Sequence, residues 1–226
     1  MNKMPTFFCE YNILDFARDD CMTFFGGMSA EDDKRDLGDN VTLLGRWSTV
    51  AEGRGYCVCK AGTAKDVTNW LYNWVKMATI KVYPILDDNQ AREIILKEAP
   101  SYTVDYSRAG DEAAPGQSLY FIKYKFHNDK RMAGYQAFAS LTEKEDNQDA
   151  GNNTCLGRWH NLGLGSGVAI CSSESEVDLY KWAFNWASMC DCEIVPVVHD
   201  RECREVITSK PDFVQKHARL LEKMAI

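Results

Sequence analysis

The segment Leu44-Gly-Arg-Trp47 returns as Leu156-Gly-Arg-Trp159, 112 residues later along the chain (44 against 156). The same offset holds without a gap as far as Ile95 and Ile207, and about a third of the aligned positions are identical. Three pairs of tryptophans coincide, which chance would not produce: Trp47 and Trp159, Trp70 and Trp182, Trp74 and Trp186. The chain is therefore a tandem duplication of one domain.

Outside this span the two copies match more loosely, and residues 8–13 resemble residues 121–126 at a slightly different offset. Residues 100–118 are polar, contain proline and glycine, and show no periodicity, as is typical of a linker. We therefore expect a first repeat over residues 1–99, a linker over 100–118, and a second repeat with a C-terminal helix over 119–226.

Composition indicates an ordinary packed protein, because 45% of the 226 residues are hydrophobic and 12% are aromatic. The net charge is −7 and no dense run of Lys and Arg occurs, which argues against a nucleic acid or an anionic membrane as partner. No apolar run is long enough for a membrane span, and Met1–Phe8 is too short for a signal-peptide core.

The cysteine content predicts a reducing compartment, either the cytoplasm or the soluble space of an organelle. An odd number of cysteines, in a chain large enough to build its own core, favours free thiols over a disulfide framework. The nine are Cys9, Cys21, Cys57, Cys59, Cys155, Cys171, Cys190, Cys192 and Cys203.

The second repeat shows the clearer secondary-structure pattern. Residues 120–126 alternate apolar side chains with lysine, which predicts a half-buried strand, and residues 129–141 have helical spacing. The polar stretch 143–153 reads as a loop. Strands are expected over 154–161 and 168–172, joined by a glycine turn as a hairpin.

Helix starts are predicted where Ser175 precedes Asp178 by three residues and where Thr63 precedes Asp66, since this is the spacing of a capping box. Each start opens a helix with a Trp/Trp/Met stripe, at 182, 186 and 189 and at 70, 74 and 77. Residues 193–198 form a further strand in which proline indicates an edge or a bulge, and 200–207 form a closing helix.

The order β-α-β-β-α-β is that of a ferredoxin-like sheet with helices on one face. The other face of such a sheet stays bare unless something covers it, and two fused copies can cover each other as a pseudo-dimer. We therefore predict an α+β protein of two tandem ferredoxin-like repeats that form an intramolecular dimeric α/β-barrel, with no prediction of further oligomerisation.

The run Gly157-Arg-Trp-His160, followed by a glycine turn, a Trp-rich helix and residues 194–200 (IVPVVHD), resembles the DUF3303 family. The resemblance covers nearly all of the second repeat and most of the first from Val41 onward. It departs at Ser48, where the family run has histidine, and at Gly26-Gly27. It implies a shape related to the dimeric α/β-barrel proteins but no established reaction. The wider relatives include cofactor-free monooxygenases, haem-degrading enzymes and isomerases.

Arg46 and Arg158 are candidate ligand-binding residues, because a strand arginine beside tryptophan can hold an anionic or planar ligand. The alternative, which we favour, is that each arginine pairs with a carboxylate of the other repeat. Trp47 and Trp159 are candidates for an aromatic pocket. The helix tryptophans are expected to be core, since their spacing is that of a buried stripe.

His160 and His199 belong to the second copy alone, because Ser48 and Asp87 stand at the equivalent positions of the first. His160 is the one candidate catalytic residue, as a general base, and both histidines are candidate ligand-binding residues. The alternative for each is a surface or hydrogen-bonded histidine.

No metal and no cofactor is predicted. The pairs Cys57-Val-Cys59 and Cys190-Asp-Cys192 could chelate from one face of a strand, but neither pair is kept in the other copy, so buried free thiols are the better interpretation. The glycine-rich residues 163–167 join two strands and are not followed closely by the helix start that a phosphate loop needs.

We therefore expect a non-catalytic binding or accessory protein that holds a small ligand between the sheets or docks on a larger assembly. One alternative is a cofactor-free monooxygenase or haem-handling enzyme, which would lose turnover but keep its fold in a His160→Ala variant. The other is a purely structural subunit, which would expose a large apolar patch.

Overall fold

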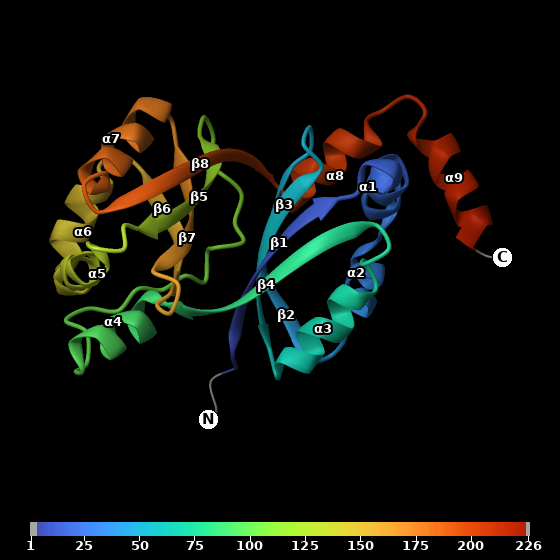
Figure 1. Ribbon diagram of the computed structural model, residues 1–226. Coiled ribbons are helices and arrows are strands. Elements are labelled where there is room, and N and C mark those ends of the chain that lie inside the picture. The colour runs from blue at the N-terminus through green and yellow to red at the C-terminus, as the bar shows by residue number, and fades with distance from the viewer. Residues whose placement is uncertain (1–3, 225–226) are drawn as a thin grey trace. The chain divides into compact units, whose positions relative to one another are not determined.

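The computed structural model describes residues 4–224, so the first three residues of the segment Met1–Phe8 lie outside it (Figure 1). The first repeat contains β1 (Thr6–Ile13), the 3-10 helix η1 (Asp15–Ala17), α1 (Arg18–Gly27), α2 (Ala30–Leu37), β2 (Val41–Thr49), β3 (Arg54–Ala61), α3 (Ala64–Tyr72), β4 (Ala78–Asp87) and α4 (Asp88–Leu96). The second contains β5 (Ser118–Phe126), α5 (Arg131–Ser140), α6 (Glu143–Ala150), β6 (Thr154–Asn161), β7 (Ser166–Ser173), α7 (Glu176–Trp186), β8 (Cys190–His199), α8 (Asp200–Thr208) and α9 (Phe213–Met224).

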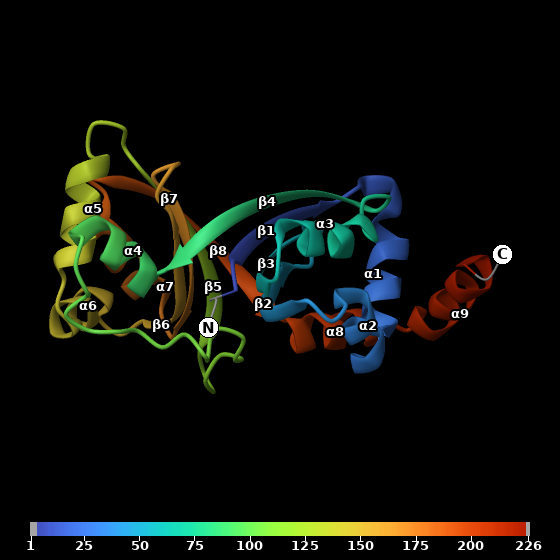
Figure 2. The same ribbon diagram turned by 90° about the horizontal axis from the view of Figure 1, so that it is seen from below.

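The chain folds into two compact units that do not coincide with the two sequence repeats. Unit 1 contains the chain up to Tyr83 together with the part from Val198 onward, and unit 2 contains Pro84–Val197. Helix α4 of the first repeat and helix α8 of the second are therefore exchanged, so that α8 packs against α1 in unit 1 and α4 packs against α5 in unit 2 (Figures 1 and 2). Strands β4 and β8 carry the chain from one unit to the other.

In unit 1 the strands pair in the order β1-β3-β2, and the end of β8 joins at β2, where Trp47 lies opposite His199. In unit 2 the order is β8-β5-β7-β6, and the end of β4 joins at β6, where Leu86 lies opposite His160. All these pairings are antiparallel, and the complete hydrogen-bonding order closes as a ring of eight strands. The predicted fold class is confirmed.

The repeated Leu-Gly-Arg-Trp motif is explained by a bulge and a close contact. The ladder shifts register between Leu43 and Gly45, as it does between Cys155 and Gly157 in the other repeat. A Cβ atom added at Gly45 would lie 2.3 Å from the Trp47 ring, so the indole packs on a backbone that has no side chain. The arginine between the glycine and the tryptophan points to the opposite face of the sheet.

One element expected as a loop is a helix. The polar residues 143–153 contain α6, whose N-cap Thr142 accepts a hydrogen bond from the backbone N–H of Glu145 and forms a complete capping box with it. The equivalent helix α2 begins in the same way at Ser29 and Asp32. The prediction of a loop was wrong because an exposed helix without buried residues carries no apolar stripe.

The two exposed helices α2 and α6 each provide an aspartate that binds the tryptophan stripe of the same unit. The indole N–H groups of Trp70 and Trp74 both donate to one carboxylate oxygen of Asp36, at 2.8 and 2.9 Å. In unit 2 the equivalent tryptophans donate in the same way to Asp149. Trp70 is buried and Trp74 half-buried, so the stripe packs its rings inward while a carboxylate satisfies the ring nitrogens.

The glycine pair at which the first repeat departs from the family pattern lies at the end of α1. A Cβ atom added at Gly26 would lie 2.6 Å from Ile207 of α8, and one at Gly27 would lie 2.1 Å from the ring of His217 in α9. The pair therefore lets α8 and α9 pack closely on α1.

Candidate functional site

Each unit contains a buried cluster of two arginines and two aspartates. In unit 1 the Arg46 guanidinium donates to Asp33 at 2.8 Å and to Asp200 at 2.5 Å. Arg204 completes the cluster through Asp200 at 3.3 Å, and the ring of Phe25 packs against both guanidinium groups. Since Asp200 belongs to the second repeat and Arg46 to the first, the arginine pairs with a carboxylate of the other repeat, as we favoured.

The cluster in unit 2 is built from the equivalent positions. Arg158 donates to Asp88 and to Asp146, each at 2.6 Å. Arg92, fully buried, donates to Asp146 at 3.3 Å, and Phe138 packs against both arginines. Asp88 belongs to the first repeat, so both clusters form because α4 and α8 are exchanged between the repeats.

The second arginine of each cluster, Arg92 or Arg204, also caps the C-terminal end of a helix of the other repeat. Arg92 donates to the carbonyl oxygens of Ala139 and Leu141, at the end of α5. Arg204 donates to those of Phe25 and Met28, at the end of α1. Carbonyl groups at the end of a helix lack the N–H donors of a following turn, and a cation at a helix C-terminus is favourable.

Two tyrosines of the segment expected as a linker complete the unit 2 cluster. Tyr106 donates to Asp88 at 2.7 Å and packs against the ring of Trp159. Tyr102 donates to Asp146 at 2.5 Å. Sequence analysis missed both tyrosines because residues 100–118 have no counterpart within the aligned repeats. Their one signal is that two aromatic side chains occur in an otherwise polar stretch.

The charges within each cluster hold one another ionised. Burial acts to raise the pKa of Asp88, but Arg158 and His160 outweigh it and hold this pKa well below its usual range. Burial acts to lower the pKa of Arg46, but its bonds to Asp200 and Asp33 outweigh that effect and raise the pKa. With two arginines against two aspartates, neither cluster offers a free charge to a ligand.

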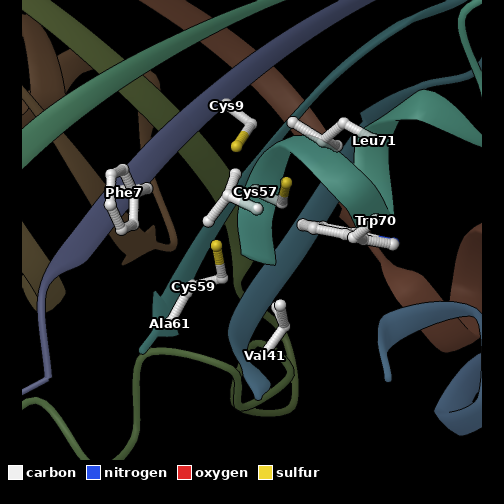
Figure 3. Packing of buried hydrophobic residues seen from close by; sticks show 9 residues of the cluster. Phe7, Cys9, Val41, Cys57, Cys59, Ala61, Trp70 and Leu71 are labelled. Carbon is white, nitrogen blue, oxygen red and sulfur yellow. The ribbon is translucent and has the colours of Figure 1, made fainter. Parts of the chain in front are cut away.

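A cavity of about 750 Å³, partly open to solvent, lies in unit 1 between the sheet and the helices. Apolar and sulfur-bearing side chains form most of its wall, among them Cys9, Cys57, Trp70 and Leu71, which Figure 3 shows between β1, β3 and α3. Its polar lining includes Tyr11 and Ser48, whose hydroxyl groups lie 2.8 Å apart. A concave, mainly apolar wall with a few polar groups is typical of small-molecule sites.

Unit 2 has a smaller cavity of about 510 Å³ at the equivalent place. His160 lines it and is only 2% exposed, with its Nδ1 atom 2.5 Å from the hydroxyl of Tyr124 and its Nε2 atom 2.5 Å from Asp88. Burial lowers the pKa of His160 more than Asp88 raises it. The structure thus places His160 in the Arg158 cluster and at a cavity wall.

The other predicted site residues lie elsewhere. Trp47 and Trp159 are buried at 0% and 1% exposure on the sheet face opposite to the arginines, and neither lines a described cavity. His199 is the N-cap of α8, where its Nδ1 atom accepts a hydrogen bond from the backbone N–H of Arg201. Asp87 caps α4 in the same way, so this position is used for helix capping in both repeats.

The cysteines are all free thiols in the described part of the chain, and most are buried. Burial raises the pKa of Cys21 to about 11, which keeps this cavity-lining thiol protonated. Among residues 4–224, no group of three or more His, Cys, Asp or Glu side chains is arranged to hold a metal ion.

The model of a domain of unknown function, DUF3303, matches the chain twice, over residues 6–99 and 118–210. The chain belongs to the DUF3303 family. The two matches confirm the duplication and the predicted family. No curated protein matches the sequence.

Solved structures share the fold of this DUF3303 protein at low sequence identity. A chlorite dismutase variant from Candidatus Nitrospira defluvii, in complex with cyanide, is 10% identical with a TM-score of 0.53, covering 89% of this chain and 93% of that one. A variant of DypB from Rhodococcus jostii, in complex with heme, is 10% identical with a TM-score of 0.51, covering 90% and 95%. A dye-decolorizing peroxidase from Bacteroides thetaiotaomicron is 9% identical with a TM-score of 0.50, covering 91% and 96%.

The residues of the two cavities do not fit haem. An axial ligand needs a free nitrogen, thiolate or similar donor that faces the cavity. Both ring nitrogens of His160 are already bonded, to Tyr124 and Asp88. The larger cavity has no histidine in its lining, and burial raises the pKa of its thiols Cys21 and Cys203.

Within residues 4–224, none of the helices has the length and apolar character needed to cross a membrane.

Proposed function

We propose that this protein binds a small, uncharged, largely apolar ligand in the cavity of unit 1. The observation that carries the proposal is the cavity itself, which lies between the sheet and the helices and has a mainly apolar wall with a few polar groups. The ligand expected from the sequence lies between the sheets, whereas this cavity lies on the helix side of one sheet.

The polar lining of this cavity favours an uncharged ligand. Arg46 reaches the wall, but its guanidinium is bonded to Asp33 and Asp200, which cancel its charge and occupy four of its five donors. Tyr11 and Ser48 keep hydrogen-bonding capacity beyond their bond to each other, since a hydroxyl group has one donor and two acceptor sites. A ligand with one hydrogen-bonding oxygen on an apolar body matches this arrangement.

The wall of the cavity also suggests a planar ligand body. Trp70 of α3, Trp74 just after the end of α3, and Phe25 of α1 line it. Aromatic rings bury large areas and stack on flat ligands in offset or edge-on geometries. In unit 1 Arg46 and Arg204 are both paired with aspartates, which supports binding over catalysis in this unit.

The test uses 2-methoxynaphthalene, a neutral planar fluorescent probe with one acceptor oxygen. We expect saturable binding to the intact protein, and weaker binding of 2-methylnaphthalene by about fivefold, which is the value of one hydrogen bond of about 1 kcal/mol. Binding is followed by the fluorescence of the probe and by native mass spectrometry of the complex.

Matched variants locate the probe. Ile80 in β4 lines the cavity of unit 1, and Cys192, at the equivalent position of β8, lines that of unit 2. Ile80→Trp should fill the first cavity and weaken binding at least about tenfold, or 1.4 kcal/mol, while Cys192→Trp should leave it unchanged. Equal binding to the Ile80→Trp variant, or no saturable binding to the unaltered protein, would show that this cavity is not the site.

A further inference from the structure

The cavity of unit 2 has a hydrogen-bonded chain of three titratable groups at its wall. Tyr124 and His160 both line the cavity, and the Tyr124 hydroxyl lies 2.5 Å from His160 Nδ1. His160 Nε2 lies 2.5 Å from Asp88 Oδ1, behind the wall. The ring of Phe138 packs on the imidazole, with ring centres 4.3 Å apart, which fixes its plane. This series of hydrogen-bonded side chains therefore runs from the cavity surface to a buried carboxylate.

The partners of Asp88 determine where the protons lie. This carboxylate also accepts hydrogen bonds from Arg158 and from the Tyr106 hydroxyl, and its pKa is held well below the usual range despite burial. Because an ionised carboxylate can only accept, His160 Nε2 must carry a proton. In the neutral ring Nδ1 is then an acceptor, so the Tyr124 hydroxyl donates to it. The lone pairs of the Tyr124 oxygen remain available.

Unit 1 is an internal control for what the fold itself requires. There Tyr11 occupies the place of Tyr124, and its hydroxyl lies 2.8 Å from Ser48, which stands where unit 2 has His160. Arg46 pairs with Asp200 in unit 1 without any histidine. The same sheet, helices and ion pairs therefore form with serine at this position. The histidine of unit 2 adds a titratable link that packing does not require.

We propose that Tyr124, His160 and Asp88 form a proton relay that removes a proton from a small planar ligand with an acidic hydroxyl group, held in the cavity of unit 2. The ligand O–H bond breaks and its proton goes to the Tyr124 oxygen, while the Tyr124 proton passes to His160 Nδ1. The products are the ligand oxyanion and an imidazolium bonded to Asp88. Tyr124 contacts the ligand as the base, and Asp88 is a positioning residue.

Charge balance supports this direction of transfer. The charged groups that face His160 are Arg158, Arg92, Asp88 and Asp146, and their charges cancel. Burial lowers the pKa of His160, so the ring is neutral at neutral pH, and its Nδ1 lone pair faces the Tyr124 hydroxyl. The imidazolium is disfavoured in the empty cavity, so its formation requires the negative charge of the ligand oxyanion. After transfer, the imidazolium and the ligand oxyanion form an ion pair in the cavity, with the Arg158 guanidinium also at the wall.

The walls of the cavity select the ligand class. Trp182 and Trp186 line one side from α7, and Phe126 lines it from β5. These rings accept a flat apolar body, and the Tyr124 oxygen meets its hydroxyl group. Phenols and enols of modest size have this shape and chemistry.

The first test measures the ionisation of a bound phenol. The probe is 4-nitrophenol, whose phenol and phenolate forms differ in absorbance, and the protein is the Ile80→Trp variant, in which the cavity of unit 1 is filled. At pH 6 we expect the bound probe to be ionised at least about tenfold more than the free probe, which corresponds to a pKa shift of one unit. Tyr124→Phe and His160→Gln should each abolish this shift.

The control for these variants is Tyr120→Phe. Tyr120 lies four residues before Tyr124 in β5, donates to Glu176, and does not line the cavity. The Tyr120→Phe variant should leave the ionisation shift of the bound 4-nitrophenol unchanged. A bound probe with its solution ionisation, a shift that survives Tyr124→Phe, or no binding at millimolar probe would each overturn the proposal.

The second test needs no ligand. Nitrogen-15 NMR of the imidazole of His160 at pH 7 should show a proton on Nε2. It should show Nδ1 without a proton and accepting a hydrogen bond. Tyr124→Phe should shift the Nδ1 resonance toward that of a nitrogen without a donor and leave Nε2 unchanged. A proton on Nδ1, or a doubly protonated ring at pH 7, would overturn the relay even if 4-nitrophenol binds.

Discussion

Asp88 belongs to the first repeat, yet its carboxylate is bonded to Arg158 of the second at 2.6 Å, just as Asp200 of the second repeat is bonded to Arg46 of the first at 2.5 Å. Each bond is possible because α4 and α8 each pack in the unit formed mainly by the other repeat. The duplicated chain is thus held together by two copies of one ion-pair cluster.

The two copies differ in burial, which predicts different energies. Asp88 is completely buried, whereas the side chain of Asp200 is 21% exposed. Asp88→Asn leaves a buried Arg158 without one of its two counter-charges, and we expect a loss of about 3–5 kcal/mol in the free energy of unfolding. Asp200→Asn should cost about 1–3 kcal/mol, because water can solvate part of the site. Urea unfolding followed by circular dichroism measures both, and a larger loss for Asp200→Asn would contradict the role of burial.

The pH dependence of stability should report on His160. Its pKa is lowered in the folded protein, so its stabilising contribution is complete above the unfolded value of about 6.5 and is lost as the pH falls through the folded value. Between these values the free energy of unfolding should fall by up to about 1.4 kcal/mol per pH unit.

The measurement compares urea unfolding of the unaltered protein and of His160→Gln at pH 7.5, 6.5 and 5.5. The glutamine variant should be less stable at pH 7.5 and should show a shallower fall with acid. Parallel slopes for His160→Gln and the unaltered protein would mean that His160 is not neutral in the fold.

Much of this architecture could be predicted from sequence because the repeat is strong and the element order is diagnostic. The arginine pairing between repeats could also be anticipated, since a strand arginine kept in both copies needs a carboxylate. The exchange of α4 and α8 could not be seen, because local patterns do not tell which unit a terminal helix packs against. Tyr102 and Tyr106 were missed because only the tertiary fold brings their irregular segment onto the Arg158 cluster.

The glycine of the repeated motif should not tolerate even a methyl group. A Cβ atom at Gly157 would lie 2.3 Å from the Trp159 ring, which is itself buried and cannot move away. We expect Gly157→Ala to cost about 1–3 kcal/mol through overpacking. In Gly163→Ala the nearest atom would be 3.6 Å away, so that variant should be within about 0.5 kcal/mol of the unaltered protein. Thermal unfolding of the two variants side by side tests this, and equal midpoints would contradict the packing.

The carboxylates that bind the tryptophan stripes should contribute to the free energy of unfolding although they lie on exposed helices. Asp149 accepts from the indole N–H groups of Trp182 and Trp186 and from the side-chain amide of Asn185. Asp149→Leu removes three acceptor contacts at once and should cost about 1–3 kcal/mol, because the half-buried donors lose their partner. Asp149→Asn keeps one acceptor oxygen and should recover part of that loss.

Trp182 and Trp186 also line the cavity of unit 2, so their fluorescence should shift to longer wavelength in Asp149→Leu as water reaches the rings. Asp36→Leu should change only the fluorescence of the tryptophans of unit 1. An unchanged emission spectrum in Asp149→Leu would show that the packing of the helix, and not the carboxylate, fixes the stripe.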